Sequence, residues 1–402
     1  MQNKTSTLVG LIACACCATC VTSAWANHRS GDRPLPENMT SGDFNRDGNT
    51  DLAIDLSGFD NIAIFEGDGA GNFTLTRHIE EDTLPKDIVS GDVDGDGRPD
   101  ILSVAEWGYD IRVYLGDNNG DFQFVNEFPG DGEPNRLALA DLNKDGKLDV
   151  IVNGPAENVI LIYFGLGGGR FSNSALEFED YPNIFGITTG DFNEDSNLDI
   201  AITYFENKTD TGSHLQILLG DGAGNFSVGQ NVVTHPQANN IQPFDLNHDG
   251  HLDFIVAGAG SENVAGLFLS TFLGDGAGNF TLNQVIELGQ GSIKGKIGAA
   301  DFNQDGNIDV AFPKSGGTEA DKSTKSTDLL IFLGDANGKF TQGQTVTVGE
   351  EPGSALPGDF NKDGRTDLAE TNRSDATLSI LLGNGDGTFT THATIPLNVP
   401  TP

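Results

Sequence analysis

Short runs of alternating hydrophobic and polar residues, each bounded by glycine, asparagine or aspartate, follow one another along most of the chain. One unit shows the pattern well: residues 86–90, 100–105 and 110–115 form three runs, and a fourth begins at Phe122 after the tight turn 116–120. Alternation with a period of two residues, interrupted by turn-forming residues, is typical of antiparallel strands and hairpins. We find no helical periodicity beyond the N-terminal segment, so the sequence predicts an all-β fold.

A stretch of the form Asp-apolar-Asn/Asp-x-Asp-Gly-x-x-Asp follows the first run of each unit. It occurs seven times and begins at Asp43, Asp92, Asp141, Asp191, Asp245, Asp301 and Asp359, with successive copies 49 to 58 residues apart. A period near 50 with four short strands per unit is typical of β-propeller blades. The sequence therefore predicts a seven-bladed β-propeller of four-stranded antiparallel blades over residues 36–402.

The repeated stretch, which we call the acidic loop and number from position 1 to position 9, is rich in hard oxygen donors. Side-chain oxygens at positions 1, 3, 5 and 9, together with the backbone carbonyl of position 7, can converge on one cation. Such a donor set suits Ca²⁺, which takes 6–8 oxygen ligands, better than zinc or copper. Glycine at position 6 permits the positive φ that turns the chain around the ion. Cationic side chains at position 7 are compatible with this arrangement because only the carbonyl faces the metal.

The sequence predicts up to seven Ca²⁺ ions. Their predicted ligands are Asp43, Asn45, Asp47, Asn49, Asp51, Asp92, Asp94, Asp96, Arg98, Asp100, Asp141, Asn143, Asp145, Lys147, Asp149, Asp191, Asn193, Asp195, Asn197, Asp199, Asp245, Asn247, Asp249, His251, Asp253, Asp301, Asn303, Asp305, Asn307, Asp309, Asp359, Asn361, Asp363, Arg365 and Asp367.

Other interpretations fit the acidic loops less well. An EF-hand needs flanking helices and usually a bidentate glutamate at position 12. Only the seventh loop has a glutamate there, Glu370. Solvated turns without metal are the second alternative, but clustered carboxylates repel one another when no counter-charge is present.

A second motif, Gly-Asp-Gly-x-Gly-x-Phe or a close variant, joins the third and fourth runs of several units. It occupies residues 67–73, 220–226, 274–280, 334–340 and 383–389. We expect its glycines to serve turn geometry and its phenylalanine to pack between neighbouring blades. Every unit begins in the same phase, since Leu35-Pro36 corresponds to Leu84-Pro85 one unit later. We therefore predict that no blade combines strands from the two ends of the chain.

Together, the acidic loop and the Gly-rich turn about 25 residues after it resemble the FG-GAP/VCBS repeats of integrin α-subunit-type propellers. The resemblance covers about residues 36–396. It implies a seven-bladed propeller with calcium in the loops that join the first and second strands. One departure is Ser196, which stands where the fourth loop should have glycine and predicts a strained or weaker site there.

The N-terminal segment is typical of an exported protein. Residues 1–26 read as a secretory signal peptide with a cleavage site after Ala26, and residues 27–35 as a short irregular arm. All four cysteines lie within the first twenty residues, and a lipoprotein-type cleavage at Cys14 is an alternative that would place the protein on the cell surface. No stretch approaches the roughly 20 apolar residues that a membrane span requires.

The acidity of the chain narrows the range of partners. The formal net charge of −37 argues against nucleic acid or an anionic membrane surface. An extracellular glycan or glycoprotein is the partner that we expect. Whether the protein is an enzyme stays open, since the sequence has no nucleophile elbow and no histidine spacing typical of a metal centre. A polysaccharide lyase or hydrolase and a structural cell-surface protein are the alternatives to a lectin-like binding or adhesion module.

We place the ligand site on the face opposite the acidic loops. Trp107 and Tyr109 can stack on a sugar ring there, with Glu106 and Asp110 accepting hydrogen bonds from its hydroxyls; an aromatic plug that covers a blade edge is the alternative. Further candidates on that face are Phe59, Glu157 and the loops 206–214 and 314–328.

Overall fold

A computed structural model describes residues 34–81, 84–105, 110–130, 134–154, 158–172, 175–178, 181–205, 212–235, 237–259, 266–316 and 325–397. Every regular element within these ranges is a β-strand. Contacts group Arg33–Pro402 into one compact unit that contains all of these strands. None of the described residues forms a helix long and apolar enough to cross a membrane.

The strands form seven antiparallel sheets, each made of four strands that are consecutive in sequence. Blades 1 and 2 contain β1 (Pro36–Gly42), β2 (Asp51–Leu56), β3 (Asn61–Gly67) and β4 (Phe73–Glu80), then β5 (Pro85–Gly91), β6 (Asp100–Ala105), β7 (Asp110–Gly116) and β8 (Phe122–Pro129). Blades 3 and 4 contain β9 (Leu137–Ala140), β10 (Asp149–Gly154), β11 (Val159–Tyr163) and β12 (Leu176–Phe178), then β13 (Ile184–Gly190), β14 (Asp199–Tyr204), β15 (His214–Gly220) and β16 (Phe226–Val233).

Blades 5 to 7 follow the same order. Blade 5 contains β17 (Ala238–Phe244), β18 (Asp253–Ala259), β19 (Leu267–Gly274) and β20 (Phe280–Gly289). Blade 6 contains β21 (Gly298–Ala300), β22 (Asp309–Lys314), β23 (Asp328–Gly334) and β24 (Phe340–Thr347). Blade 7 contains β25 (Pro352–Gly358), β26 (Asp367–Asn372), β27 (Thr377–Gly383) and β28 (Phe389–Pro396). The predicted seven-bladed propeller is therefore confirmed.

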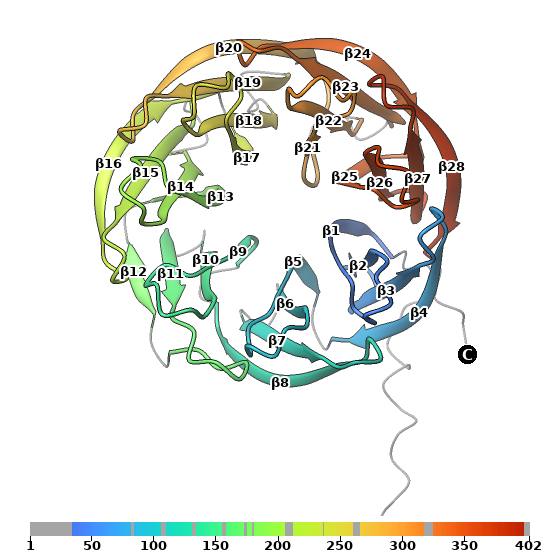
Figure 1. Ribbon diagram of the computed structural model, residues 1–402, viewed down its shortest axis with the longest axis horizontal. Coiled ribbons are helices and arrows are strands. Elements are labelled where there is room, and N and C mark those ends of the chain that lie inside the picture. The colour runs from blue at the N-terminus through green and yellow to red at the C-terminus, as the bar shows by residue number, and fades with distance from the viewer. Residues whose placement is uncertain are drawn as a thin grey trace, which may run out of the picture. The chain divides into compact units, whose positions relative to one another are not determined.

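The blades are arranged in a ring in which the first strand of each lies nearest the centre and the fourth lies outside (Figure 1). Second and third strands are buried on both faces, as β2, β10 and β11 show. Because both faces are apolar, each blade packs against two neighbours, and seven hydrophobic clusters fill the seven junctions. Burial of this apolar surface is the main force that holds the blades together.

The phenylalanine of the Gly-rich turn packs between blades, as predicted. Phe73 meets Phe360 of blade 7 with ring centroids 5.3 Å apart, in an edge-to-face arrangement. Three further junctions repeat this pairing: Phe44 with Phe122, Phe192 with Phe280, and Phe302 with Phe389. Each pair joins a turn to position 2 of the acidic loop in the preceding blade, so the two motifs stabilise the same junctions.

The ring closes without exchange of a strand, which confirms the prediction about phase. Blade 1 contains only β1 to β4, and blade 7 only β25 to β28. The junction between them uses the same kinds of contact as the others: a shared cluster that includes Leu52 and Ile380, and a hydrogen bond from Gly71 N to Phe360 O of 3.0 Å. Arg373 of blade 7 also forms an ion pair with Glu37 of blade 1.

Candidate functional sites: the acidic loops and the mouth ring

Each acidic loop joins the first and second strands of its blade and is folded by its own side chains. In the first loop, Gly48 N donates to Asp43 Oδ2 (3.0 Å), Asp47 N to Asn45 Oδ1 (2.9 Å) and Asn49 N to Asp47 Oδ1 (2.7 Å). The same three bonds, from positions 6 to 1, 5 to 3 and 7 to 5, occur in all six other loops. The loops therefore share one conformation.

The aspartate at position 9 has a structural role that the sequence did not reveal. Asp51 is fully buried, and its Oδ2 and Oδ1 accept hydrogen bonds of 2.9 Å from Phe44 N and Gly67 N. All seven position-9 aspartates make these two bonds, so each fastens its loop to the end of the third strand. Desolvation raises the pKa of Asp51 to about 6, although the two bonds oppose this shift.

The loop backbone passes through the left-handed region twice. Position 6 has φ between 69° and 90° in all seven loops and is glycine in six of them. Ser196 has φ 69° and still donates its N–H to Asp191 Oδ2 (2.9 Å), so the fourth loop keeps the shared conformation at a cost of about 1–2 kcal/mol. Position 4 is also left-handed, and it is glycine only in the second loop, Gly95.

The oxygen donors fit a hard cation. In the second loop, carboxylate oxygens of Asp92, Asp94 and Asp100 all lie within 4.8 Å of one another. In the first loop, Asp43 Oδ1 is shielded from solvent and has no hydrogen-bond partner. Desolvation and the nearby charge of Asp92 raise the pKa of Asp94, a repulsion that a cation would relieve. Carboxylate and amide oxygens without nitrogen or sulfur are the donors that Ca²⁺ prefers.

Position 7 separates the loops into two groups. Arg98, Lys147 and Arg365 form ion pairs with the position-5 aspartate of their own loops. The other four loops have a neutral asparagine or a histidine at this position. Of these, His251 bonds to Glu194 of the preceding loop, which raises the pKa of the imidazole. Asn307 Nδ2 also donates to the position-5 carboxylate of its own loop, Asp305 Oδ1 (2.9 Å), so the use of the position-7 carbonyl as a metal ligand stays a prediction.

At the other end of the first strands, one position forms a second ring. It lies five residues before each acidic loop, and we call it the mouth ring: Asn38, Asp87, Arg136, Gly186, Asn240, Lys296 and Ser354. Members with short polar side chains donate hydrogen bonds to backbone carbonyls of the next blade. These bonds run from Asn38 Nδ2 to Lys86 O (2.7 Å), from Asn240 Nδ2 to Gly295 O (3.0 Å) and from Ser354 Oγ to Glu37 O (2.6 Å). Asp87 accepts from Leu137 N of blade 3 (3.1 Å).

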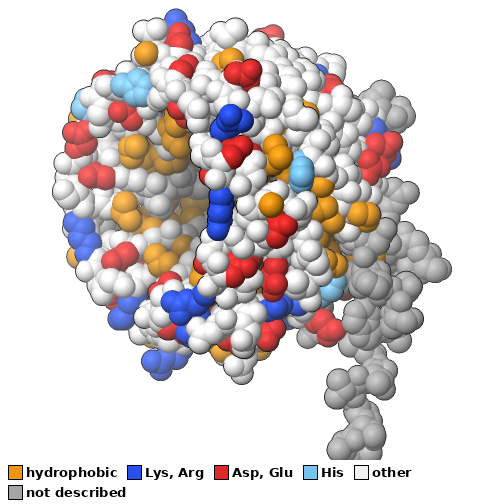
Figure 2. Space-filling model, turned by 45° about the vertical axis from the view of Figure 1, so that its right-hand side comes forward, with side chains coloured by type: hydrophobic (Ala, Val, Ile, Leu, Met, Phe, Trp, Pro, Cys, Tyr) orange, Lys and Arg blue, Asp and Glu red, His pale blue; other side chains and the backbone are white. Residues whose placement is uncertain are grey.

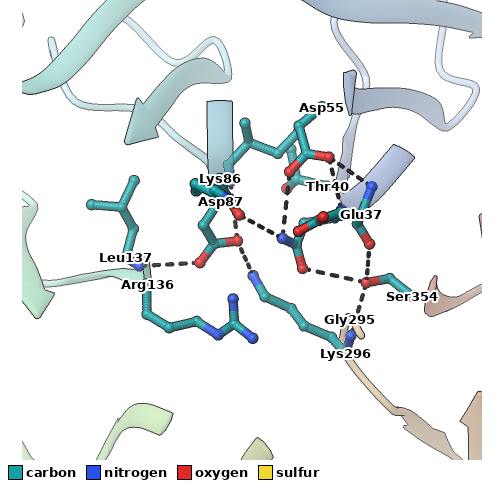
Figure 3. A network of polar contacts seen from close by, with 12 residues as sticks. Glu37, Thr40, Asp55, Lys86, Asp87, Arg136, Leu137, Gly295, Lys296 and Ser354 are labelled. Atoms are coloured by element: carbon teal, nitrogen blue, oxygen red, sulfur yellow. Dashed lines mark hydrogen bonds and ion pairs between the residues drawn. The ribbon is translucent and has the colours of Figure 1, made fainter. Parts of the chain in front are cut away.

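Lys296 and Arg136 differ from the other members because their side chains reach over the centre of the ring (Figure 3). Lys296 Nζ, from blade 6, lies 2.6 Å from Asp87 Oδ1 of blade 2. Arg136 Nη1 donates to Asn135 O (3.0 Å), and its guanidinium points toward the same space as Lys296. The sequence alone could have located this ring, but only after the seven units were aligned on their acidic loops.

The aromatic site that we predicted from the sequence lies outside the described residues. This holds for Trp107, Tyr109 and Glu106, for Glu157, and for residues 206–211 and 317–324 of the two candidate loops. The predicted signal segment 1–26 and most of the arm 27–35 also lie outside them.

The fold and the acidic loops together define a class, the β-propellers whose blades each carry an oxygen-rich loop between the first and second strands. A family model described as FG-GAP-like repeat matches residues 43–103, 92–152, 141–202 and 245–312, which is more than half of the chain. The protein belongs to the FG-GAP-like repeat family.

Comparison with solved structures agrees with this fold. The crystal structure of a candidate 6-phosphogluconolactonase from Bacteroides fragilis superposes with a TM-score of 0.62 over 90% of this chain and 96% of that one, at 14% sequence identity. At this identity the likeness concerns the fold alone. No curated protein sequence matches the chain significantly.

Proposed function

We propose that the protein is an exported, calcium-stabilised propeller that acts as a binding or adhesion module for extracellular carbohydrate or glycoprotein. The observation that supports the calcium part is the shared conformation of the acidic loops, which arranges the same oxygens in the same way seven times. In each loop the side chains at positions 1, 3, 5 and 9 and the carbonyl at position 7 would hold the ion.

Calcium in these loops would stabilise the fold rather than take part in chemistry. At millimolar calcium and a Kd of about 10⁻⁴ M, each site would contribute about 1.4 kcal/mol to the free energy of unfolding. In the loops with Arg98, Lys147 or Arg365 at position 7, the position-5 carboxylate already has a cationic partner. Loops with a neutral residue at position 7, such as Asn49 and Asn307, should therefore bind calcium more tightly.

The calcium proposal is tested by isothermal titration of calcium into chelator-treated protein, combined with thermal unfolding in millimolar calcium and in chelator. We expect several equivalents of calcium to bind and the melting temperature to rise with calcium. A melting temperature that is the same in both conditions would contradict a stabilising role. Magnesium at equal concentration is the control for a general effect of charge screening.

The ligand proposal is tested by a glycan-array screen of the mature chain in calcium and in chelator. We expect specific binding in calcium, lost in chelator, and reduced in a Trp107→Ala/Tyr109→Ala double variant. Full binding by that double variant would remove the aromatic loop from the proposal. Release of shortened products from the bound glycans would instead identify a polysaccharide-degrading enzyme. N-terminal sequencing of protein from culture medium and from cell membranes tests cleavage after Ala26 against lipidation at Cys14.

A further inference from the structure

Charge is distributed unevenly between the residues that lead into the acidic loops and the rest of the molecule. The seven residues that precede each acidic loop contain four cationic residues, Lys86, Arg136, Lys294 and Lys296, and two acidic ones, Glu37 and Asp87. The whole chain has 22 lysines and arginines against 59 aspartates and glutamates. The segments that lead into the acidic loops therefore hold more cationic than acidic residues, in a protein that is otherwise strongly acidic.

The acidic groups near the mouth ring are neutralised by ion pairs within the protein or by a raised pKa. Asp87 pairs with Lys296, and Glu37 pairs with Arg373. Asp55 is fully buried and accepts hydrogen bonds from Glu37 N and Asn38 N, both of 2.9 Å. Burial, together with the nearby charge of Glu37, raises the pKa of Asp55 to about 8, so this carboxyl is largely protonated at neutral pH.

Arg136 is one of the cations that these two ion pairs do not neutralise. Among the residues that the structure describes, the partner of the Arg136 guanidinium is the neutral carbonyl of Asn135, and no carboxylate pairs with it. Lys296 keeps 31% of its side chain exposed and uses one of its donors on Asp87. Both side chains point toward the centre of the ring (Figure 3). Figure 2 shows a hollow with hydrophobic side chains on its wall in the face that Figure 1 presents, whereas Figure 3 looks at the ring from the opposite side.

The two cations also have no part in joining the blades at their own junctions. Where blade 3 meets blade 4, Asn153 Nδ2 donates to Ile184 O (2.8 Å) in place of Arg136. Where blade 6 meets blade 7, the backbone of Lys296 makes the contact, with its N–H donating to Ser354 Oγ (2.8 Å) and its carbonyl accepting from Ala355 N (3.0 Å). Neither side chain is therefore needed at its own junction among the described residues, although Lys296 Nζ is held by Asp87 of blade 2.

We propose that the mouth ring is an anion subsite in which Arg136, assisted by Lys296, binds the carboxylate of an acidic saccharide such as a uronate. The planar guanidinium can donate two parallel hydrogen bonds to a carboxylate, and the Lys296 ammonium adds a point charge beside it. This inference rests on the proposed carbohydrate-binding function and names its ligand class. It predicts that binding weakens as salt is added, because salt screens charges that are partly exposed to solvent.

The experiment measures binding of trigalacturonate and of its fully methyl-esterified form to the calcium-loaded full chain by isothermal titration calorimetry. The ester keeps the sugar and removes the charge. We expect the acid to bind, the ester to bind at least about tenfold more weakly, and Arg136→Gln to lose a similar factor for the acid only. Arg170→Gln is the matched control, because Arg170 is exposed on the outer part of blade 3. Thermal unfolding of each variant establishes that it is folded.

The outcomes separate this inference from the function on which it rests. Equal binding of the acid and the ester, or unchanged affinity for the acid in folded Arg136→Gln, would overturn the anion subsite and leave a glycan-binding function intact. Failure of the folded, calcium-loaded chain to bind any glycan, neutral or acidic, would overturn both.

Discussion

The two ends of the first strands show opposite behaviour around the same ring. At the acidic-loop end, every blade uses the same oxygens for the same backbone hydrogen bonds, and position 9 is aspartate in all seven. At the mouth-ring end, the equivalent position holds asparagine, aspartate, arginine, glycine, lysine or serine. Both ends lie in the same fold and contact the next blade, so the difference reflects what each position must do.

A position cannot vary when one side chain alone can satisfy buried backbone groups. Asp51 accepts from two buried N–H groups at once, which needs two acceptor oxygens in one side chain. The mouth ring differs because the hydrogen bond to the next blade can also be made by a side chain at another position. At Gly186, for example, Thr203 Oγ1 makes the bond to Ala238 O (2.6 Å) that a longer side chain would otherwise make. Because of this redundancy, the side chains of Arg136 and Lys296 are not needed to join their own blades to the next, which is compatible with the proposed anion subsite.

The largest expected effect comes from removing a position-9 aspartate. Asp51→Ala should lower the free energy of unfolding by about 3–5 kcal/mol, because it leaves two buried N–H groups without acceptors and creates a cavity. Urea unfolding in chelator measures this without a contribution from calcium.

Asp47→Ala is the control for this substitution, since Asp47 is exposed at position 5 of the same loop. It should cost less than about 1 kcal/mol in chelator, yet should abolish calcium stabilisation of that loop. Equal losses for the two variants in chelator would contradict the structural role of position 9.

The next effect concerns Asp55, whose pKa of about 8 is raised in the folded state. A carboxyl with a raised pKa stabilises the fold fully at low pH, and this contribution is lost as the pH rises through about 8. Relative to Asp55→Asn, the wild-type protein should therefore lose about 1.4 kcal/mol of unfolding free energy per pH unit between pH 5 and 8. Denaturant unfolding at several pH values measures the difference.

Asparagine is a suitable replacement because the chain already uses it at the equivalent site of blade 3. Asn153 Oδ1 accepts from Asn135 N (3.1 Å) and Arg136 N (2.9 Å), as Asp55 does from its own two partners. A stability difference that stays constant from pH 5 to 8 would show that Asp55 is ionised in the folded protein.

Replacing Glu370 should have a smaller effect than replacing Asp51, and it should raise the free energy of unfolding rather than lower it. Glu370 is fully buried in β26, and burial raises its pKa well above the ordinary value, although a backbone contact from Gly353 opposes the shift. Blade 1 has Ile54 at the same position. Glu370→Ile should raise the free energy of unfolding at pH 7 by about 1–3 kcal/mol. The gain should shrink toward pH 4, where the unfolded chain is also protonated; a loss of stability at pH 7 would mean that the carboxyl has a stabilising partner.

The sequence predicted the fold well because the repeat is long, periodic and marked by turn residues. It placed the strands of blade 2 within about two residues and found the interblade role of the turn phenylalanines. It did not reveal the two buried hydrogen bonds of Asp51 or the left-handed backbone at position 4, where Arg46 and Lys144 stand. Those features depend on how the loop meets the third strand, which is distant in sequence. The mouth ring was not predicted because its members occupy equivalent positions in the seven blades but differ in residue type.

The smallest effect tests the one loop that departs from its pattern. Ser196 has a left-handed backbone, which costs about 1–2 kcal/mol for a residue with a Cβ. Glycine would remove this cost, but it would also increase the conformational entropy of the unfolded chain, which offsets part of the gain in stability. Ser196→Gly should therefore raise the free energy of unfolding by about 0.5–1 kcal/mol, and Gly48→Ser, at φ 81° in the first loop, should lower it by a similar amount. Guanidinium unfolding in chelator measures both variants. Changes of the same sign would mean that the Ser196 side chain, rather than its backbone, determines the stability of the fourth loop.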